Sequence, residues 1–181
     1  MKKFLLILSL LTIIFPLWAE ASDTAKSSIV MDIDSGRVLY EKNANEKRLI
    51  ASTTKIMTAL LSLESGKLNE MVEAKDEILK MYGTSIYLSL HEKMKLEDLV
   101  YGLLLRSGND AAVVIATYLS GSEEAFVKEM NKKVKSLGLK NTQFKNCTGL
   151  DEEGHYSSAY DMAIIAKELL KHEEILKFSS K

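Results

Sequence analysis

Residues 51–66 read ASTTKIMTALLSLESG, in which a polar tetrad leads directly into an apolar pattern. The pattern has the period of an α-helix, because its apolar side chains recur three and four positions apart. The residues that share this face are Ile56, Ala59, Leu60 and Leu63. Gly66 is a typical C-terminal stop, so the sequence predicts an amphipathic helix that begins at Ser52.

The polar tetrad places Ser52 and Lys55 three positions apart, and residues at this spacing are neighbours on a helix. A serine hydroxyl is a weak nucleophile until a neighbouring base removes its proton. A lysine becomes such a base when burial and the positive end of a helix lower its pKa. The pair also fits a simpler interpretation, in which Ser52 caps the helix and Lys55 is a solvated residue of its first turn.

On the N-terminal side of this helix, the sequence predicts a β-hairpin over residues 29–40. Ile29, Met31 and Ile33 alternate with other side chains, a turn follows at residues 34–36, and residues 38–40 are again apolar. A hairpin of two strands is not independently stable and needs more sheet or helix packing to complete it. We therefore expect further strands from the C-terminal side.

On the C-terminal side, the pattern becomes mostly helical. Alternation over residues 86–90 predicts a short strand, and residues 96–105 and 109–119 predict two buried helices. Ser122 is placed to cap a third helix that ends near residue 138. Ser158 and Asp161 have the spacing of a capping box ahead of a fourth helix through Ile165 and Leu169.

The two buried helices are separated by Ser107-Gly108-Asn109, a polar triplet in strongly apolar surroundings. Such a triplet presents a hydroxyl and an amide to the cleft that the helices border. Serine, glycine and asparagine are also common in turns and helix caps, so by itself the triplet does not establish a site.

The first residues of the chain have the layout of a secretory signal. Lys2 and Lys3 precede an apolar run that ends at Trp18, and small residues follow at Ala19 and Ala21. An uncleaved anchor is the alternative, but the run is shorter than the roughly 20 residues that span a bilayer. We expect residues 1–21 to be a signal peptide cleaved near Ala21, which places the protein on the extracytoplasmic face of the cell envelope.

Composition sets the class of the remaining chain. The 181 residues include 24 Lys and Arg against 25 Asp and Glu, and 46% are hydrophobic, as in an ordinary globular domain. The near-zero net charge argues against nucleic acid as a partner, because no basic excess neutralises phosphates. A single Cys excludes an intramolecular disulfide and a multi-cysteine zinc site.

The two polar motifs together carry a resemblance to a known family. S-x-x-K occurs once, at Ser52, and S-x-N occurs once, at Ser107, in the order found in penicilloyl-serine enzymes. The chain resembles the low-molecular-mass penicillin-binding proteins that act as serine D-alanyl-D-alanine carboxypeptidases. The resemblance extends over nearly the whole mature chain, through residues 30–40, 51–58, 104–112 and 142–161.

The resemblance implies an α/β fold of the penicillin-binding-protein and β-lactamase-like transpeptidase type, with an antiparallel sheet and a helical region. It implies that Ser52 is the acyl-ester nucleophile, with its N–H in the oxyanion hole, and that Lys55 is the general base. Ser107 would relay a proton, and Asn109 would bind substrate. The substrate would be a peptidoglycan stem peptide ending in D-Ala-D-Ala, with β-lactams as covalent inhibitors.

No metal or organic cofactor is implied by this resemblance. The three histidines, His91, His155 and His172, are scattered without the spacing of metal ligands. We expect each to be a surface or helix-end residue.

The family's third motif, K-[ST]-G, does not occur in these 181 residues. Residues 147–149, Cys-Thr-Gly, look like a decayed copy, but they lie in a predicted loop, and cysteine brings no fixed positive charge. We expect the motif beyond Lys181, with the remaining sheet and any C-terminal segment that associates with the membrane. Residues 22–181 would then be the N-terminal portion of a catalytic domain that is truncated at its C-terminus.

Two other functions are also compatible with the first two motifs. A β-lactamase-like hydrolase would share the first two motifs, but its E-x-x-x-N motif does not occur after Ser107. A non-catalytic secreted domain that binds cell-wall peptide would account for the missing third motif. The intact set of Ser52, Lys55, Ser107 and Asn109 argues against that second alternative.

Overall fold

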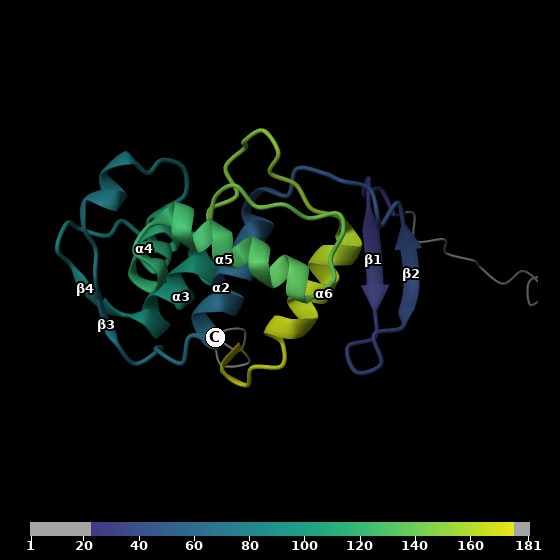
Figure 1. The fold of residues 1–181 in the computed structure, drawn as a ribbon, viewed down its shortest axis with the longest axis horizontal. Helices are drawn as coiled ribbons and strands as arrows, with labels where there is room; N and C mark the ends of the chain where they lie inside the picture. The colour runs from purple at the N-terminus through teal and green to yellow at the C-terminus, as the bar shows by residue number, and fades with distance from the viewer. Residues whose placement is uncertain (1–22, 176–181) are drawn as a thin grey trace, which may run out of the picture.

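The computed structural model describes residues 23–175, so the predicted signal peptide, residues 1–21, lies outside the described residues. The strands are β1 (Ser28–Met31), β2 (Val38–Lys42), β3 (Met71–Glu73) and β4 (Lys93–Lys95). The α-helices are α2 (Lys55–Glu64), α3 (Leu96–Arg106), α4 (Asn109–Ser120), α5 (Glu123–Ser136) and α6 (Ala159–Leu169). Two 3₁₀ turns are η1 (Ala51–Thr54) and η2 (Asp76–Lys80). The helices form the middle of the molecule, with one strand pair at each end (Figure 1).

The predicted hairpin is confirmed. β1 and β2 pair antiparallel, with Ser28 opposite Lys42 and an irregular register between Val30 and Met31. The turn closes where the Gly36 N–H donates to the Asp32 carbonyl at 2.9 Å, and Gly36 has a positive φ of 72°, which glycine adopts without strain. Helix α6 packs against β1, and the two strands form the whole of this sheet within the described residues.

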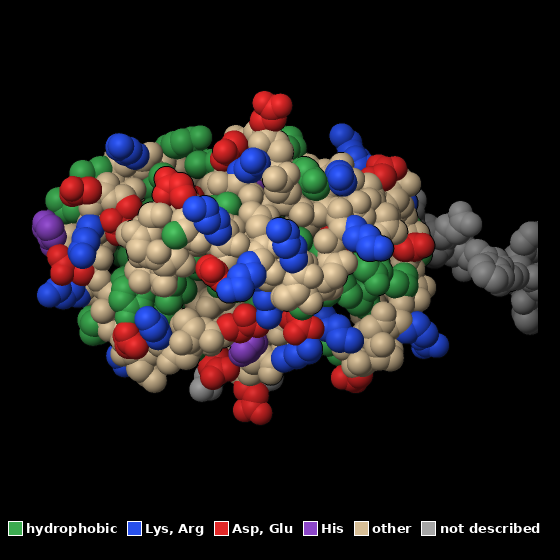
Figure 2. All heavy atoms as spheres, in the orientation of Figure 1, with side chains coloured by type: hydrophobic (Ala, Val, Ile, Leu, Met, Phe, Trp, Pro, Cys, Tyr) green, Lys and Arg blue, Asp and Glu red, His purple; other side chains and the backbone are tan. Residues whose placement is uncertain are grey.

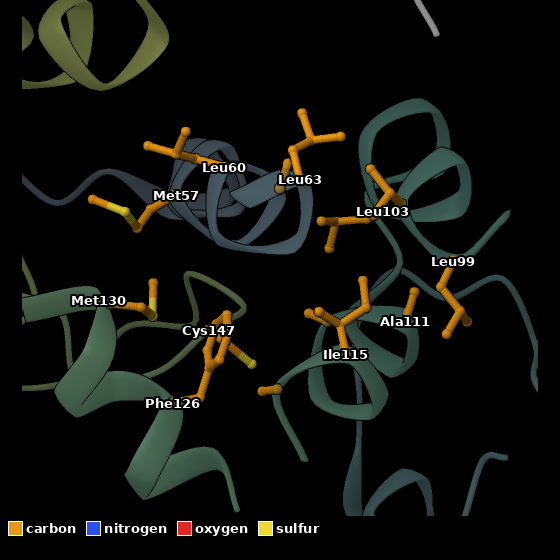
Figure 3. Packing of buried hydrophobic residues seen from close by; sticks show 14 of the residues in the cluster. Met57, Leu60, Leu63, Leu99, Leu103, Ala111, Ile115, Phe126, Met130 and Cys147 are labelled. Carbon is orange, nitrogen blue, oxygen red and sulfur yellow. The ribbon is translucent and has the colours of Figure 1, made fainter. Parts of the chain in front are cut away.

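The core lies between helices α2 to α5. Met57 and Leu60 of α2, Leu103 of α3, Ile115 of α4 and Phe126 of α5 are all buried and belong to one apolar cluster (Figure 3). Side chains at helical spacing thus meet across four helices, which is how an apolar stripe removes its surface from water. The core holds the start of α2 and the start of α4 in a fixed relation.

Helix α4 is the most deeply buried of these elements. Its first eight residues, Asn109 to Ala116, are all buried, including the polar Asn109 and Asp110. A helix that is apolar on all sides is expected in the middle of a core. The polar side chains at its N-terminus therefore face other parts of the protein and not solvent.

The predicted strand within residues 86–90 is wrong. The backbone N–H groups of Ile86 and Leu88 donate to the Asp110 carboxylate, at 3.0 Å each, and not to another strand. Tyr87 has a positive φ of 64°, which interrupts an extended chain. The alternation arises because Ile86 and Leu88 pack against the core from a loop.

The sequence pattern does not predict the second small sheet, which β3 and β4 form. β3 and β4 pair antiparallel, with Met71 opposite Lys95 and Glu73 opposite Lys93. Each strand has three residues of mixed polarity, which is too short for periodicity to reveal. This sheet joins the end of α2 to the start of α3.

The predicted helix caps are confirmed in part. The Ser122 hydroxyl accepts the Ala125 N–H at 3.1 Å, and the Ser158 hydroxyl accepts the Asp161 N–H at 3.1 Å. The Asp161 carboxylate, however, accepts from the Asn141 N–H and the Thr142 hydroxyl, at 2.8 Å each. Only one half of the predicted capping box therefore forms, and Asp161 instead holds the preceding loop.

The surface mixes both signs of charge. Lysine and arginine side chains are interspersed with aspartate and glutamate over the face shown in Figure 2, and their total numbers are nearly equal. Between residues 23 and 175, no helix combines the length and the hydrophobicity needed to cross a bilayer.

Candidate active site

Ser52 and Lys55 lie at the junction of η1 and α2. The structure begins the α-helix at Lys55 and places Ser52 in a 3₁₀ turn, so the prediction of one helix from Ser52 is corrected at its first turn. Residues three apart eclipse one another in a 3₁₀ turn, and the Lys55 Nζ accordingly lies 3.3 Å from the Ser52 Oγ. Ser52 caps neither element, so its hydroxyl is free to face the adjoining pocket.

The Lys55 ammonium group is almost fully buried, with 2% of the residue exposed. Besides Ser52, its Nζ contacts the backbone carbonyl of Thr148 at 2.6 Å. Burial lowers the pKa of Lys55 from its ordinary value of 10.5 to about 8. At pH 7 roughly a tenth of the lysine is then neutral, which is the form that a general base requires.

Asn109 enters the same region from the start of α4. Its Nδ2 donates to the Tyr82 carbonyl at 2.6 Å, and its backbone N–H donates to the Thr84 carbonyl at 2.8 Å. Gly83 lies against this amide, because a Cβ built there would be 2.8 Å from the Asn109 Nδ2. The loop at residues 82–84 thus fixes the orientation of the asparagine side chain.

A pocket of about 430 Å³ brings these parts together. Ser52 and Asn109, 57 positions apart in the chain, both line it. Its remaining walls are Ala51, Tyr82, Gly83, Thr84, Thr148, Gly149, Leu150 and Asp151. The volume is in the range of small-molecule and peptide sites.

Ser107 occupies the break between α3 and α4 but does not line the pocket. It adopts a left-handed conformation with φ of 56° and ends α3. Its Oγ is buried and, among the described residues, is the one such side-chain oxygen or nitrogen without a hydrogen-bond partner. A buried hydroxyl left without a partner costs roughly 1–3 kcal/mol, so this group is a candidate for a role beyond folding.

Two loops that no sequence motif indicates complete the pocket. Residues 82–84 carry no motif. Cys147, Thr148 and Gly149 lie in a loop and not on a strand, which agrees with the prediction that they are not the third motif. Thr148 contributes its backbone carbonyl, which accepts from the Lys55 Nζ, and a pattern of side chains cannot predict such a contact.

His155 is buried and contacts η1, the turn that carries Ser52, contrary to the expectation of a surface or helix-end residue. Its Nδ1 accepts the Lys145 N–H at 3.1 Å, so its Nε2–H is the donor to the Thr54 hydroxyl at 2.8 Å. Burial lowers the pKa of His155, which keeps the ring neutral in this arrangement. The histidine therefore links η1, through Thr54, to the loop that carries Lys145.

The Asp110 carboxylate fixes the loop that forms the Tyr82 and Gly83 side of the pocket. Asp110 accepts from the Ser85 hydroxyl at 2.6 Å and from three backbone N–H groups, those of Ile86, Leu88 and Ala111. These hydrogen bonds lower the pKa of Asp110 although burial opposes them. The loop that carries Tyr82 and Gly83 is thereby fastened to the start of α4.

The site contains no metal-binding cluster. Across residues 23–175, no three His, Cys, Asp or Glu side chains lie close enough together to hold a metal ion. The chemistry that this arrangement supports directly is transfer of a proton from a serine hydroxyl to a buried lysine, beside a pocket with an oriented amide.

Comparison with protein families gives a match over most of the chain. A family model described as D-alanyl-D-alanine carboxypeptidase matches residues 18–181. The chain is 53% identical over 166 residues to the D-alanyl-D-alanine carboxypeptidase DacF of Bacillus subtilis. This alignment covers 89% of the chain and 43% of DacF, so the chain spans less than half the length of that relative.

Solved structures give the same result. The chain is similar to the D-alanyl-D-alanine carboxypeptidase DacD from Francisella tularensis, with a TM-score of 0.82 and 31% identity over 86% of the chain and 40% of DacD. It is also similar to penicillin binding protein 5 from Haemophilus influenzae, with a TM-score of 0.79 and 36% identity over 84% of the chain and 47% of that protein. These similarities support the predicted fold class and favour carboxypeptidases over the two alternative functions.

Proposed function

Because this chain belongs to the D-alanyl-D-alanine carboxypeptidase family of serine peptidases, we propose that it acts on peptides that end in D-Ala-D-Ala. The observation that carries the proposal is the buried Lys55 amine, 3.3 Å from the Ser52 hydroxyl at the edge of a pocket. The proposed reaction removes the terminal D-alanine of a peptidoglycan stem peptide through an acyl-enzyme on Ser52. Its biological role would be in peptidoglycan biosynthesis and maintenance of cell shape.

The proposed acylation begins when Lys55 in its neutral form takes the proton of the Ser52 hydroxyl. The Ser52 Oγ then attacks the carbonyl carbon of the penultimate D-alanine, and the backbone N–H of Ser52 stabilises the developing oxyanion. Collapse of this intermediate breaks the peptide bond. The terminal D-alanine leaves with a proton on its nitrogen, and water then hydrolyses the ester.

Ser107 and Asn109 have supporting roles in this proposal. The orphaned Ser107 hydroxyl relays the proton from Lys55 to the leaving nitrogen, which would give this buried group the partner that it lacks. Asn109 binds the substrate amide from the pocket wall. β-Lactams would enter the same pocket as mimics of D-Ala-D-Ala and acylate Ser52.

A labelling experiment with a fluorescent penicillin tests the proposal on the protein expressed from its full coding sequence. We expect a stable covalent adduct on Ser52 and release of D-alanine from a diacyl-Lys-D-Ala-D-Ala peptide. Ser52→Ala removes the attacking oxygen and should give neither signal. Rapid turnover of the penicillin without D-alanine release would indicate a β-lactamase-like hydrolase, and the absence of both reactions would indicate a non-catalytic binding domain.

We further propose that the protein is exported, with residues 1–21 as its signal peptide. The support is the arrangement of two lysines, an apolar run and small residues at positions 19 and 21. N-terminal sequencing of the protein from the producing cells should begin near Ser22. A mature protein that starts at Met1 would contradict cleavage.

A further inference from the structure

The turn at residues 146–150, called here the Asn146 turn, forms the wall behind Lys55. Its Thr148 carbonyl accepts from the Lys55 Nζ at 2.6 Å, and its Cys147 carbonyl accepts from the Thr58 hydroxyl at 2.9 Å. Two consecutive carbonyls of the turn thus point at the first turns of α2. The conformation of the turn decides where the Lys55 amine lies.

The side chain of Asn146 closes this turn. Its Oδ1 accepts the Gly149 N–H at 2.8 Å and the Thr148 hydroxyl at 3.2 Å. Its Nδ2 donates to the Leu150 carbonyl at 2.9 Å and to the Glu152 carboxylate at 3.2 Å. Asparagine side chains commonly fold the following backbone in this way, because the amide oxygen replaces a backbone acceptor.

Within the turn, Cys147 is held by a residue other than Asn146. The Glu123 carboxylate, at the start of α5, accepts the Cys147 N–H at 3.0 Å and the Cys147 thiol at 3.1 Å. These contacts hold Cys147 in place. The Thr148 carbonyl and the Gly149 N–H belong to the same peptide unit, so the rotation of that unit depends on the hydrogen bond from the Gly149 N–H to Asn146.

The Thr148 carbonyl can orient the neutral Lys55 amine, because it accepts one of the N–H groups of that amine. An uncharged lysine has two N–H donors and one lone pair. When one N–H donates to the Thr148 carbonyl, the lone pair can be directed at the Ser52 hydroxyl 3.3 Å away. A lysine without this acceptor can rotate, and its lone pair loses a fixed direction.

We propose that Asn146 is a positioning residue for acyl transfer, which closes the turn so that the Thr148 carbonyl orients the Lys55 amine toward Ser52. The inference rests on the proposed function, in which Lys55 takes the Ser52 proton. Asn146 itself lies outside the pocket lining and acts only through the turn.

The test compares two variants of Asn146 with a matched control in the full-length protein. Asn146→Leu keeps the size of the side chain and removes its hydrogen bonds, whereas Asn146→Asp keeps an acceptor oxygen for the Gly149 N–H. Asn131→Leu is the control, because Asn131 also makes hydrogen bonds to this loop, to the N–H and carbonyl of Phe144, at 3.0 and 2.8 Å. These bonds lie outside the turn.

We expect Asn146→Leu to lower the rate constant of acylation by penicillin about 10- to 100-fold, because a small misplacement of a catalytic group has effects of this size. The dissociation constant of the non-covalent penicillin complex should change less than the rate constant, because only three of the ten residues that line the pocket, Thr148, Gly149 and Leu150, belong to the turn. Asn146→Asp keeps the acceptor but turns its second oxygen toward the Leu150 carbonyl and the Glu152 carboxylate, so its rate should lie between those of Asn146→Leu and the wild type. Asn131→Leu should lower the melting temperature without lowering the rate constant.

A second readout does not depend on acylation of Ser52. Acetylation of lysines by an N-hydroxysuccinimide ester, followed by mass spectrometry, should be slow at Lys55 in the wild type. It should be several-fold faster in Asn146→Leu only, because the amine is released from Thr148. If the wild type does not react with penicillin, the proposed function fails, and this readout still tests the turn.

The outcomes that overturn the inference are specific. Wild-type acylation and wild-type Lys55 acetylation in Asn146→Leu would show that the turn does not need Asn146. Equal loss of acylation in Asn146→Asp and Asn146→Leu would show that the acceptor oxygen is not the feature that matters. Equal loss in Asn131→Leu would reduce the role of Asn146 to general support of the loop.

Discussion

Gly149→Ala is expected to destabilise the protein by about 3 kcal/mol or more and to lower acylation of Ser52 at least about 100-fold. A Cβ at this position would lie 1.9 Å from the Ala51 carbonyl oxygen and 3.0 Å from the Ser52 nitrogen. These are backbone atoms, so no side-chain rotation relieves the clash. Either η1, which carries Ala51 and Ser52, or the Asn146 turn must move.

The matched control for this variant is Gly138→Ala. Gly138 also has a positive φ, 70°, but no atom lies within 4 Å of a Cβ built there. It should cost only the roughly 1–2 kcal/mol of the left-handed conformation and leave acylation unchanged. Thermal unfolding and penicillin labelling of both variants separate backbone strain from the clash. A Gly149→Ala protein that labels at the wild-type rate would contradict the tight contact between the two turns.

Lys55→Ala is expected to lower the acylation rate constant about 10²- to 10⁴-fold while the protein retains a cooperative thermal transition. The methyl group cannot accept the Ser52 proton, whereas the core residues of α2 are untouched. Loss of a buried amine also removes the cost of burying it, which offsets part of the lost packing. Stopped-flow acylation and thermal unfolding measure the two effects.

The pH dependence supplies the internal check on this prediction. Burial lowers the pKa of Lys55 to about 8, and only the neutral amine has a lone pair for the Ser52 proton. The wild-type acylation rate should therefore rise with pH through about 8 and level off above it. The rise should be absent from the residual rate of Lys55→Ala. Full-speed acylation by Lys55→Ala would exclude Lys55 as the base.

Patterns of local sequence predicted several elements well. The apolar face of α2, the buried character of α4 and the caps Ser122 and Ser158 depend on residues within a few positions of one another. The pairing of Ser52 with Lys55 is equally local, since three positions of helical chain bring the side chains together. Such contacts are set by helix geometry and are accessible from sequence.

Errors occurred where a distant residue replaced the expected local partner. The alternation at residues 86–90 predicted a strand, but the donors of this segment go to Asp110, more than 20 positions away. The expected partner of Ser158 in a capping box, Asp161, binds instead to the loop that contains Thr142. A carboxylate can satisfy several donors at once, and the sequence does not indicate which donors those are.

The amino-acid sequence by itself determined the family resemblance, the helical order and the placement of a serine with a lysine three positions later. Only the tertiary structure decided that Lys55 is buried, that Ser52 and Asn109 line one pocket, and that the Thr148 carbonyl contacts the lysine. The physical reason is that desolvation and backbone carbonyls act on the lysine through space. Residues 93 positions apart have no common local pattern, and they meet only when the core has packed the helices.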